Sequence, residues 1–361
     1  MKSSRREFVK ATVAVGAALG AAGMPEIQAA QSGGKLPMPT PGAKALMALF
    51  GLKYPIFEAS HGRATSPELA IAVSNAGAMG ALASLATPDD ARNAVSKVRA
   101  ATKGPFVVNW ILRDAPVSLQ SALDAGAPIV QFSWGMPTRE MISAIRAAKA
   151  KLAMQVTSAE SARAALDLGA DYLVCQGTEA GGHVQATRGL YEALPIVLEE
   201  AKQIPVVAAG GIGNGQGIRK ALLAGASAAA LGTRFVATVE SNAHPEYKRA
   251  VIAAHAKDTA FTNCFQDGWL ATHRTLRNGT FVRWEAAGCP RPGQRPGEGD
   301  VVATNRDGTK VLRYGFQSPV QGMDGAITEC PLFAGLGVDF VKDIPSAGGL
   351  IERLWRECVT A

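Results

Sequence analysis

From Tyr54 onward the chain alternates between short apolar runs and longer alanine-rich stretches with helical periodicity. The short runs predict strands at 55–59, 79–83, 106–111, 129–132, 152–156, 172–176, 206–209 and 228–231. The longer stretches predict helices at 67–75, 88–101, 117–124, 138–148, 159–168, 190–202 and 217–224. Because a parallel neighbour requires a crossover connection, this order predicts a series of parallel βαβ units.

Eight such units favour an α/β fold, a (β/α)8 TIM barrel over residues 54–235. The alternative is an open doubly wound sheet, which needs G-x-G-x-x-G after its first strand. The nearest run, 211–216, follows the seventh strand and ends in the wrong residue, so we predict the barrel. Periodicity weakens over 236–361, which predicts a C-terminal irregular and helical cap, with helices at 244–256 and at about 347–358.

The pattern of residues 1–30 indicates an export signal of the twin-arginine type. Residues 31–53 are expected to form a lead-in to the barrel. Arg5 and Arg6 precede an uncharged stretch at 11–22, which is too short to span a bilayer. A chance amphipathic N-terminus is the alternative. We therefore expect a periplasmic protein without stable membrane insertion, with the export machinery for folded proteins as a partner.

The charge distribution and the number of cysteines bear on whether the protein binds nucleic acid or contains disulfides. The formal net charge is +7, of which the predicted signal contributes +2, and the basic residues are scattered. No concentrated basic stripe is present, so we expect no nucleic-acid partner. Five cysteines leave at least one unpaired; Cys175 lies in an apolar run and predicts a core residue. The one disulfide that we consider joins Cys289 and Cys330.

Glycines follow the seventh and eighth predicted strands, at the end where barrel enzymes place their sites. Gly210-Gly211 and Gly232-Thr233 would let backbone N–H groups approach a phosphate, with the Thr233 hydroxyl as a further donor. The alternative is that these glycines only form tight turns.

Two amides, Asn109 and Gln176, end the third and sixth predicted strands, across the barrel mouth. Each can donate and accept hydrogen bonds at the edge of a heterocycle. A phosphate at one side and amides at the other favour FMN over a small sugar phosphate.

A histidine, His183, follows Gly181-Gly182 after the sixth strand, which predicts an imidazole over the pocket. Histidine can take a proton or stabilise an anion near neutral pH. A metal site of Cys175, Glu179 and His183 is rejected, because Cys175 should point away from the pocket. We predict no metal site.

Three further side chains at strand ends are predicted to line the pocket for a small-molecule substrate. They are His61, Trp110 and Trp134. Core packing is the alternative for both tryptophans, and His61 could either assist His183 or only contact the substrate.

These residues resemble the nitronate monooxygenase family of FMN-dependent barrel enzymes, over about 54–354. The most specific motifs are 176–183, 205–212 and 231–235. The resemblance implies that His183 is the catalytic residue. With the neighbouring glycines included, the predicted FMN-binding residues are Asn109, Gln176, Gly181, Gly182, Gly210, Gly211, Ala230, Leu231, Gly232 and Thr233.

The resemblance implies oxidation of alkyl nitronates by dioxygen, which gives a carbonyl compound and nitrite. His183 would abstract the α-proton of a nitroalkane or stabilise the nitronate. The chain departs from the family at 184–187 and at Ser60-His61, where the family has Pro-Met, and both places line the mouth. The main alternative is a flavin-dependent reductase of quinones or enoyl thioesters that uses a nicotinamide; a non-redox sugar-phosphate barrel and an exported binding module remain open.

Overall fold

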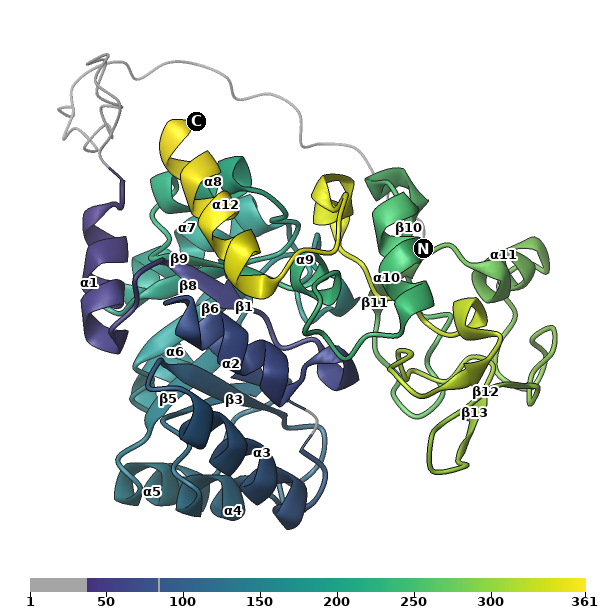
Figure 1. The fold of residues 1–361 in the computed structure, drawn as a ribbon, viewed down its shortest axis with the longest axis horizontal. Helices are drawn as coiled ribbons and strands as arrows, with labels where there is room; N and C mark the ends of the chain where they lie inside the picture. Colours follow the sequence, from purple (N-terminus) through teal and green to yellow (C-terminus); the bar gives the residue numbers. More distant parts are fainter. Residues whose placement is uncertain (1–37, 84) are drawn as a thin grey trace, which may run out of the picture. The chain divides into compact units, whose positions relative to one another are not determined.

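The computed structural model describes residues 38–83 and 85–361; the predicted export signal lies outside them. The described part contains an eight-stranded parallel sheet in the order β1-β9-β8-β6-β5-β4-β3-β2. Its strands are β1 (Ile56–Glu58), β2 (Gly80–Leu82), β3 (Phe106–Ile111), β4 (Ile129–Ser133), β5 (Lys151–Val156), β6 (Tyr172–Gln176), β8 (Val206–Ala209) and β9 (Ala228–Leu231). A parallel bridge between Phe57 and Met79 joins its two ends. The barrel prediction is confirmed (Figure 1), and the open sheet is excluded.

Helices connect consecutive strands, close to the predicted bounds. They are α2 (Pro67–Asn75), α3 (Pro88–Ala101), α4 (Leu119–Asp124), α5 (Arg139–Ala147), α6 (Ala159–Asp167), α7 (Leu190–Ala201) and α8 (Gly215–Leu223). The side chains of Ser66, Thr87 and Ser158 each accept a hydrogen bond from a backbone N–H of the first turn. These caps satisfy backbone donors that have no partner within the helix, and they thereby fix where each helix begins.

A helix that the sequence did not predict, α1 (Pro41–Phe50), lies in the expected lead-in. Thr40 caps its start, and Gly51 ends it with a φ of 67°. Leu46 is buried in the apolar cluster of the barrel interior. Phe50 meets Tyr172 edge-on, with ring centroids 5.5 Å apart. Because Tyr172 begins β6, α1 closes the end of the barrel opposite the strand C-termini.

The last helix, α12 (Ala347–Thr360), completes the barrel wall instead of belonging to the cap. It lies along α8 (Figure 1), where the Gly215 N–H donates to Glu357 Oε2 at 2.9 Å. Arg219 Nη1 donates to the Cys358 carbonyl oxygen at 3.2 Å. The closing helix that the sequence predicts at about 347–358 is therefore present, and it packs on the barrel, so the cap is inserted between β9 and this helix.

The cap contains two small antiparallel sheets. The first joins β7 (Gly182–His183), in the loop after β6, to β11 (His273–Leu276) and β10 (Thr259–Thr262); the second joins β12 (Val301–Thr304), β13 (Lys310–Leu312) and β14 (Asp324–Gly325). Its helices are α10 (Pro245–Ala253) and α11 (Gly279–Ala286), and α9 (Thr233–Val236) follows β9. Short 3-10 turns lie at Gly62–Ala64, Ala256–Asp258, Ile327–Glu329 and Leu336–Phe340. Pairing of β7 with β11 attaches the cap directly to the loop that carries His183.

All five cysteines are free thiols in the structure, so Cys289 and Cys330 are not paired. Cys175 is buried, as predicted. Among the described residues, no helix combines the length and the apolar character that crossing a membrane requires.

Glu58, at the end of β1, is a buried acid whose replacement should stabilise the protein. Its Oε2 accepts the Ala81 N–H at 3.0 Å, and its Oε1 has no partner among the described residues. Burial raises its pKa well above the usual value, so above the ordinary glutamate pKa there is a pH range in which the folded state holds a proton that the unfolded state has lost.

Because of this difference in pKa, the free energy of unfolding falls as the pH rises above the ordinary glutamate pKa. The fall stops once the pH exceeds the raised pKa of Glu58 in the folded state. The Glu58→Gln variant stays neutral and keeps the acceptor. It is expected to gain about 1–2 kcal/mol in free energy of unfolding at pH 8, the scale of one unsatisfied buried group, and little at pH 4. Urea denaturation at the two pH values measures this; an equal gain at both would contradict it.

Candidate active site

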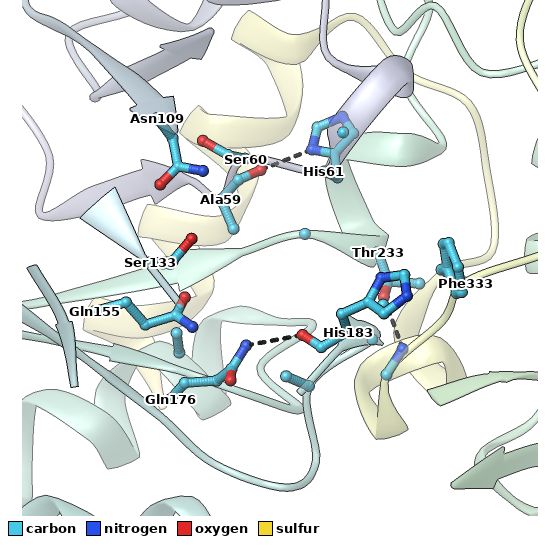
Figure 2. A pocket seen from close by; sticks show the side chains of 18 of the residues that line it. Ala59, Ser60, His61, Asn109, Ser133, Gln155, Gln176, His183, Thr233 and Phe333 are labelled. Atoms are coloured by element: carbon cyan, nitrogen blue, oxygen red, sulfur yellow. Dashed lines mark hydrogen bonds between the residues drawn. The ribbon is translucent and has the colours of Figure 1, made fainter. Parts of the chain in front are cut away.

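Most of the predicted site residues meet in one cavity of about 270 Å³ at the C-terminal ends of the barrel strands. Figure 2 shows Asn109, Gln155 and Gln176 on one side, with His61, Thr233 and His183 on the other. The predicted residues that line this cavity are His61, Asn109, Trp134, Gln176, Gly181, Gly182, His183, Gly210, Gly211, Ala230, Gly232 and Thr233.

Two predicted residues, Trp110 and Leu231, do not line the cavity. Trp110 is buried in the layer between sheet and helices, where its Nε1 donates to Ser118 Oγ at 3.0 Å. Successive strand residues face opposite sides, so Trp110 points outward because its neighbour Asn109 points inward. Leu231 is turned outward in the same way beside Ala230. The placement of Trp110 in the substrate pocket was wrong.

One end of the cavity is formed by glycine backbone. Gly210 and Gly211 have φ values of 131° and 68°, and a Cβ on Gly211 would lie 2.9 Å from Glu179 Cβ. Within the described part of the chain, the N–H groups of Gly211 and Gly232 have no hydrogen-bond acceptor. Thr233 Oγ1 accepts the Gly335 N–H at 3.0 Å, which leaves its own hydrogen free to donate. Close approach and unpaired donors together suit an anionic group.

The opposite end is an ordered network of amides. Gln131 Nε2 donates to Asn109 Oδ1 at 2.9 Å, which leaves the Asn109 NH2 group for other acceptors. Gln176 Oε1 accepts the Gln185 N–H at 2.9 Å. Gln185 Oε1 in turn accepts Gln155 Nε2 at 2.7 Å. Sequence reasoning missed Gln131 and Gln155, although their inward alternation on neighbouring strands was readable.

His183 projects from β7 toward the cavity in a neutral form. Its Nε2 is buried and has no hydrogen-bond partner among the described residues. Burial lowers its pKa to about 3, with smaller contributions from His273 and Arg113. His183 is therefore an uncharged imidazole throughout the neutral pH range.

His61, which follows β1, is a second neutral imidazole at the cavity. Its Nδ1 lies 2.7 Å from the Ala59 carbonyl oxygen, which can only accept, so Nδ1 carries the proton. Its Nε2 is buried without a partner among the described residues. Burial lowers its pKa to about 4. One ring nitrogen of His61 is therefore held by the chain, and the other is buried.

The cap supplies residues that the sequence did not point to. Trp269, Phe316 and Phe333 line the cavity, and His273 pairs with His183 across the two strands. His273 Nδ1 lies 3.0 Å from the Ala271 carbonyl oxygen, and its Nε2 accepts the Phe265 N–H at 3.2 Å. Both nitrogens are thereby satisfied, and burial lowers the His273 pKa to about 4. Nothing in the local sequence marked these positions.

The two ends of the cavity fit the two parts of FMN, the phosphate at the glycine backbone and the ring edge at the amides. The family and the solved barrels that this chain matches are flavin-dependent oxidoreductases, and the chain is an enzyme of that class. Within the class, it belongs to the nitronate monooxygenase family, whose model matches residues 43–120 and 116–357. Members of this family are FMN-dependent flavoenzymes.

Individual relatives differ in the activities for which they are named. A nitronate monooxygenase of Paraburkholderia phytofirmans is 33% identical, over 71% of this chain and 82% of its own. A dehydrogenase of a hydroxy-methyl-oxo-octahydroindene-carboxyl-CoA from Mycobacterium tuberculosis is 31% identical, over 87% and 96%.

Solved structures show the same range. FabK from Thermotoga maritima has a TM-score of 0.73 at 29% identity, covering 87% of this chain and 95% of its own. A nitroalkane oxidase of Streptomyces ansochromogenes has a TM-score of 0.71 at 30% identity, covering 88% and 98%.

Proposed function

We propose that the enzyme oxidises alkyl nitronates with dioxygen, and that His183 contacts the substrate. The observation that carries this proposal is the neutral imidazole with a buried, unpartnered Nε2 at the cavity. Family membership and the nitroalkane oxidase neighbour support it. When bound, FMN would accept electrons from the substrate and pass them to dioxygen.

The glycine end and the amide end are the parts of the chain that would hold FMN. The N–H groups of Gly211 and Gly232 and the hydroxyl of Thr233 would donate to the phosphate. The oxygens of Asn109 and Gln176 already accept hydrogen bonds within the protein, so their NH2 groups would donate to acceptors on the ring edge. One hydrogen of the Gln176 NH2 group already points to the His183 carbonyl oxygen at 3.5 Å, which leaves the other for the ring.

The low pKa of His183 bears on which form of the substrate is used. An imidazole with a pKa of about 3 is a weak base for the α-proton of a nitroalkane. In the neutral tautomer with a proton on Nε2, it donates a hydrogen bond to a nitronate oxygen without a proton transfer. We therefore propose the preformed nitronate anion as the substrate, in preference to the neutral nitroalkane.

Assays with 2-nitropropane and its nitronate test this proposal. Under air, the purified holoenzyme is expected to consume oxygen and release nitrite with the nitronate, at least about tenfold faster than with the nitroalkane. Anaerobically, the nitronate should bleach the flavin. Bleaching by NADH or NADPH alone, with no nitronate turnover, would contradict the proposal.

A nicotinamide-dependent reductase is the second candidate. It is supported by two matches with other names, the Mycobacterium tuberculosis CoA-ester dehydrogenase and FabK, each of which covers 87% of this chain. The same anaerobic assay distinguishes the two candidates.

The cellular location also remains a proposal. Arg5 and Arg6, with the uncharged stretch after them, support export by the twin-arginine route to the periplasm. Fractionation of cells that produce the full chain tests this, because a cytoplasmic holoenzyme with an intact N-terminus would contradict it.

A further inference from the structure

Three rings from separate segments form a contact set at the cavity mouth, which we name the aromatic clamp. It consists of His183 in β7, Trp269 between β10 and β11, and Trp134 after β4. The indole of Trp269 stacks on the His183 imidazole, with centroids 3.8 Å apart and planes at 23°. Trp134 meets Trp269 nearly edge-on, at 4.9 Å and 69°. The near-perpendicular contact of the two indoles is a favoured aromatic geometry, and the His183 ring is in face-to-face contact with Trp269, so each ring restricts the next.

Gln185 holds the far end of the clamp. The backbone of Trp134 has a φ of 62°, a left-handed conformation that a bulky residue adopts at a cost. Its N–H donates to Gln185 Oε1 at 3.0 Å. Because Gln185 lies just after His183 in the chain, the contacts run from His183 through Trp269 and Trp134 back to the same loop.

Arg113 fixes the Trp269 segment to the barrel. Its Nη1 donates to the Gly268 carbonyl oxygen at 2.6 Å, and its Nε donates to Asp114 Oδ2 at 2.7 Å. The guanidinium carbon lies 5.6 Å from the Trp269 ring centroid and 5.5 Å from that of Phe316, within cation–π distance. The indole is therefore held from the cap and from the loop after β3.

We propose that Trp269 is the positioning residue for His183, and that Trp134 and Gln185 keep Trp269 in place. This inference rests on the proposed function, in which His183 contacts the substrate. Stacking fixes the plane of the imidazole and covers it from water. Displacement of a reacting group by about 1 Å can cost about 100-fold in rate, so this support matters for turnover.

The surroundings of His183 indicate how loss of the stack would be detected. His273 of β11 lies opposite His183 of β7 and is neutral. Arg113 is the cation that contributes to lowering the pKa of His183. Burial is the largest cause of its lowered pKa. Removing the indole admits water, so the pKa of His183 should rise toward the ordinary value of about 6.5.

Two variants of Trp269 in the FMN-loaded enzyme test the proposal. Trp269→Leu removes the stack, whereas Trp269→Phe retains an aromatic ring. We expect kcat/KM for the nitronate to fall about 10- to 100-fold in Trp269→Leu and to stay within about threefold of wild type in Trp269→Phe. Flavin content and circular dichroism confirm that each variant is folded.

A second readout is independent of turnover. Diethyl pyrocarbonate modifies neutral imidazoles, and peptide mass spectrometry reports its rate at His183. In wild type that rate should be slow and flat between about pH 5 and 7.5, because the group stays neutral. In Trp269→Leu it should be faster and should decline on acidification with a midpoint nearer 6.5.

The outcomes separate the two proposals. An unchanged modification profile in Trp269→Leu, or a Trp269→Phe variant as impaired as Trp269→Leu, would overturn the positioning role. A shifted profile in an enzyme that does not oxidise nitronates would support the positioning role and reject the proposed function.

Gln185 variants provide the matched test if Trp269→Leu fails to fold. Gln185→Glu keeps an acceptor for the Trp134 N–H, and Gln185→Leu removes it. Only Gln185→Leu is expected to show the shifted modification profile at His183, and the same shift in both variants would overturn the role of that hydrogen bond.

Discussion

Replacement of His183 by alanine is expected to lower nitronate turnover by about 10²- to 10⁴-fold while FMN stays bound. The imidazole is the neutral group with a free, buried nitrogen in the loop after β6, and the FMN-binding donors proposed here lie on other residues. Oxygen uptake measures turnover, and the flavin absorbance of the purified variant measures cofactor retention.

A matched control for this variant is His255→Ala. His255 is exposed and contacts Asp339, with Nδ1 3.1 Å from Oδ1, and it does not line the cavity. Its replacement should leave turnover unchanged. Full activity in His183→Ala would remove this residue from the mechanism, and colourless protein would show that its role is in cofactor binding.

The second large effect is expected from Gly232→Asp, which should weaken FMN binding by at least about 100-fold. A Cβ at this position would come no closer than 3.8 Å to Ala59 Cβ, so the first side-chain atom fits without a clash. A carboxylate beside the phosphate adds like-charge repulsion of about 4 kcal/mol for unit charges 4 Å apart at an intermediate dielectric. Equilibrium binding of FMN to the apoprotein measures the effect.

Gly232→Asn is the neutral variant of nearly equal size. It should bind FMN much more tightly than Gly232→Asp, and the difference should shrink in high salt because screening weakens the repulsion. Equal losses in both variants would mean that the side chain blocks the site by its volume, and tight binding by Gly232→Asp would place the phosphate elsewhere.

Local patterns in the sequence were sufficient to predict the barrel. The short apolar runs and the longer stretches of helical periodicity each report on a few neighbouring residues, and both agreed with the observed strands and helices. The rule that sites lie at strand C-termini then gave His183, Asn109 and Gln176. The error at Trp110 arose from treating two adjacent strand residues as if both faced the cavity.

The parts that the sequence did not predict depend on contacts between distant segments. Trp269 and His273 reach the site because β7 pairs with β11. These strands are about ninety residues apart in the sequence, so a periodic pattern of neighbouring residues does not predict their pairing. The lead-in helix α1 and the barrel role of α12 were missed for the same reason, since each is defined by what it covers.

The insertion of the cap between β9 and α12 has a consequence for the order of events during synthesis. Residues 232–346 must all leave the ribosome before the final wall segment can dock on α8. Until then the apolar faces that it covers remain open to water, which favours capture by a chaperone. The barrel wall of the nascent chain thus stays incomplete until α12 has been synthesised, near the end of translation.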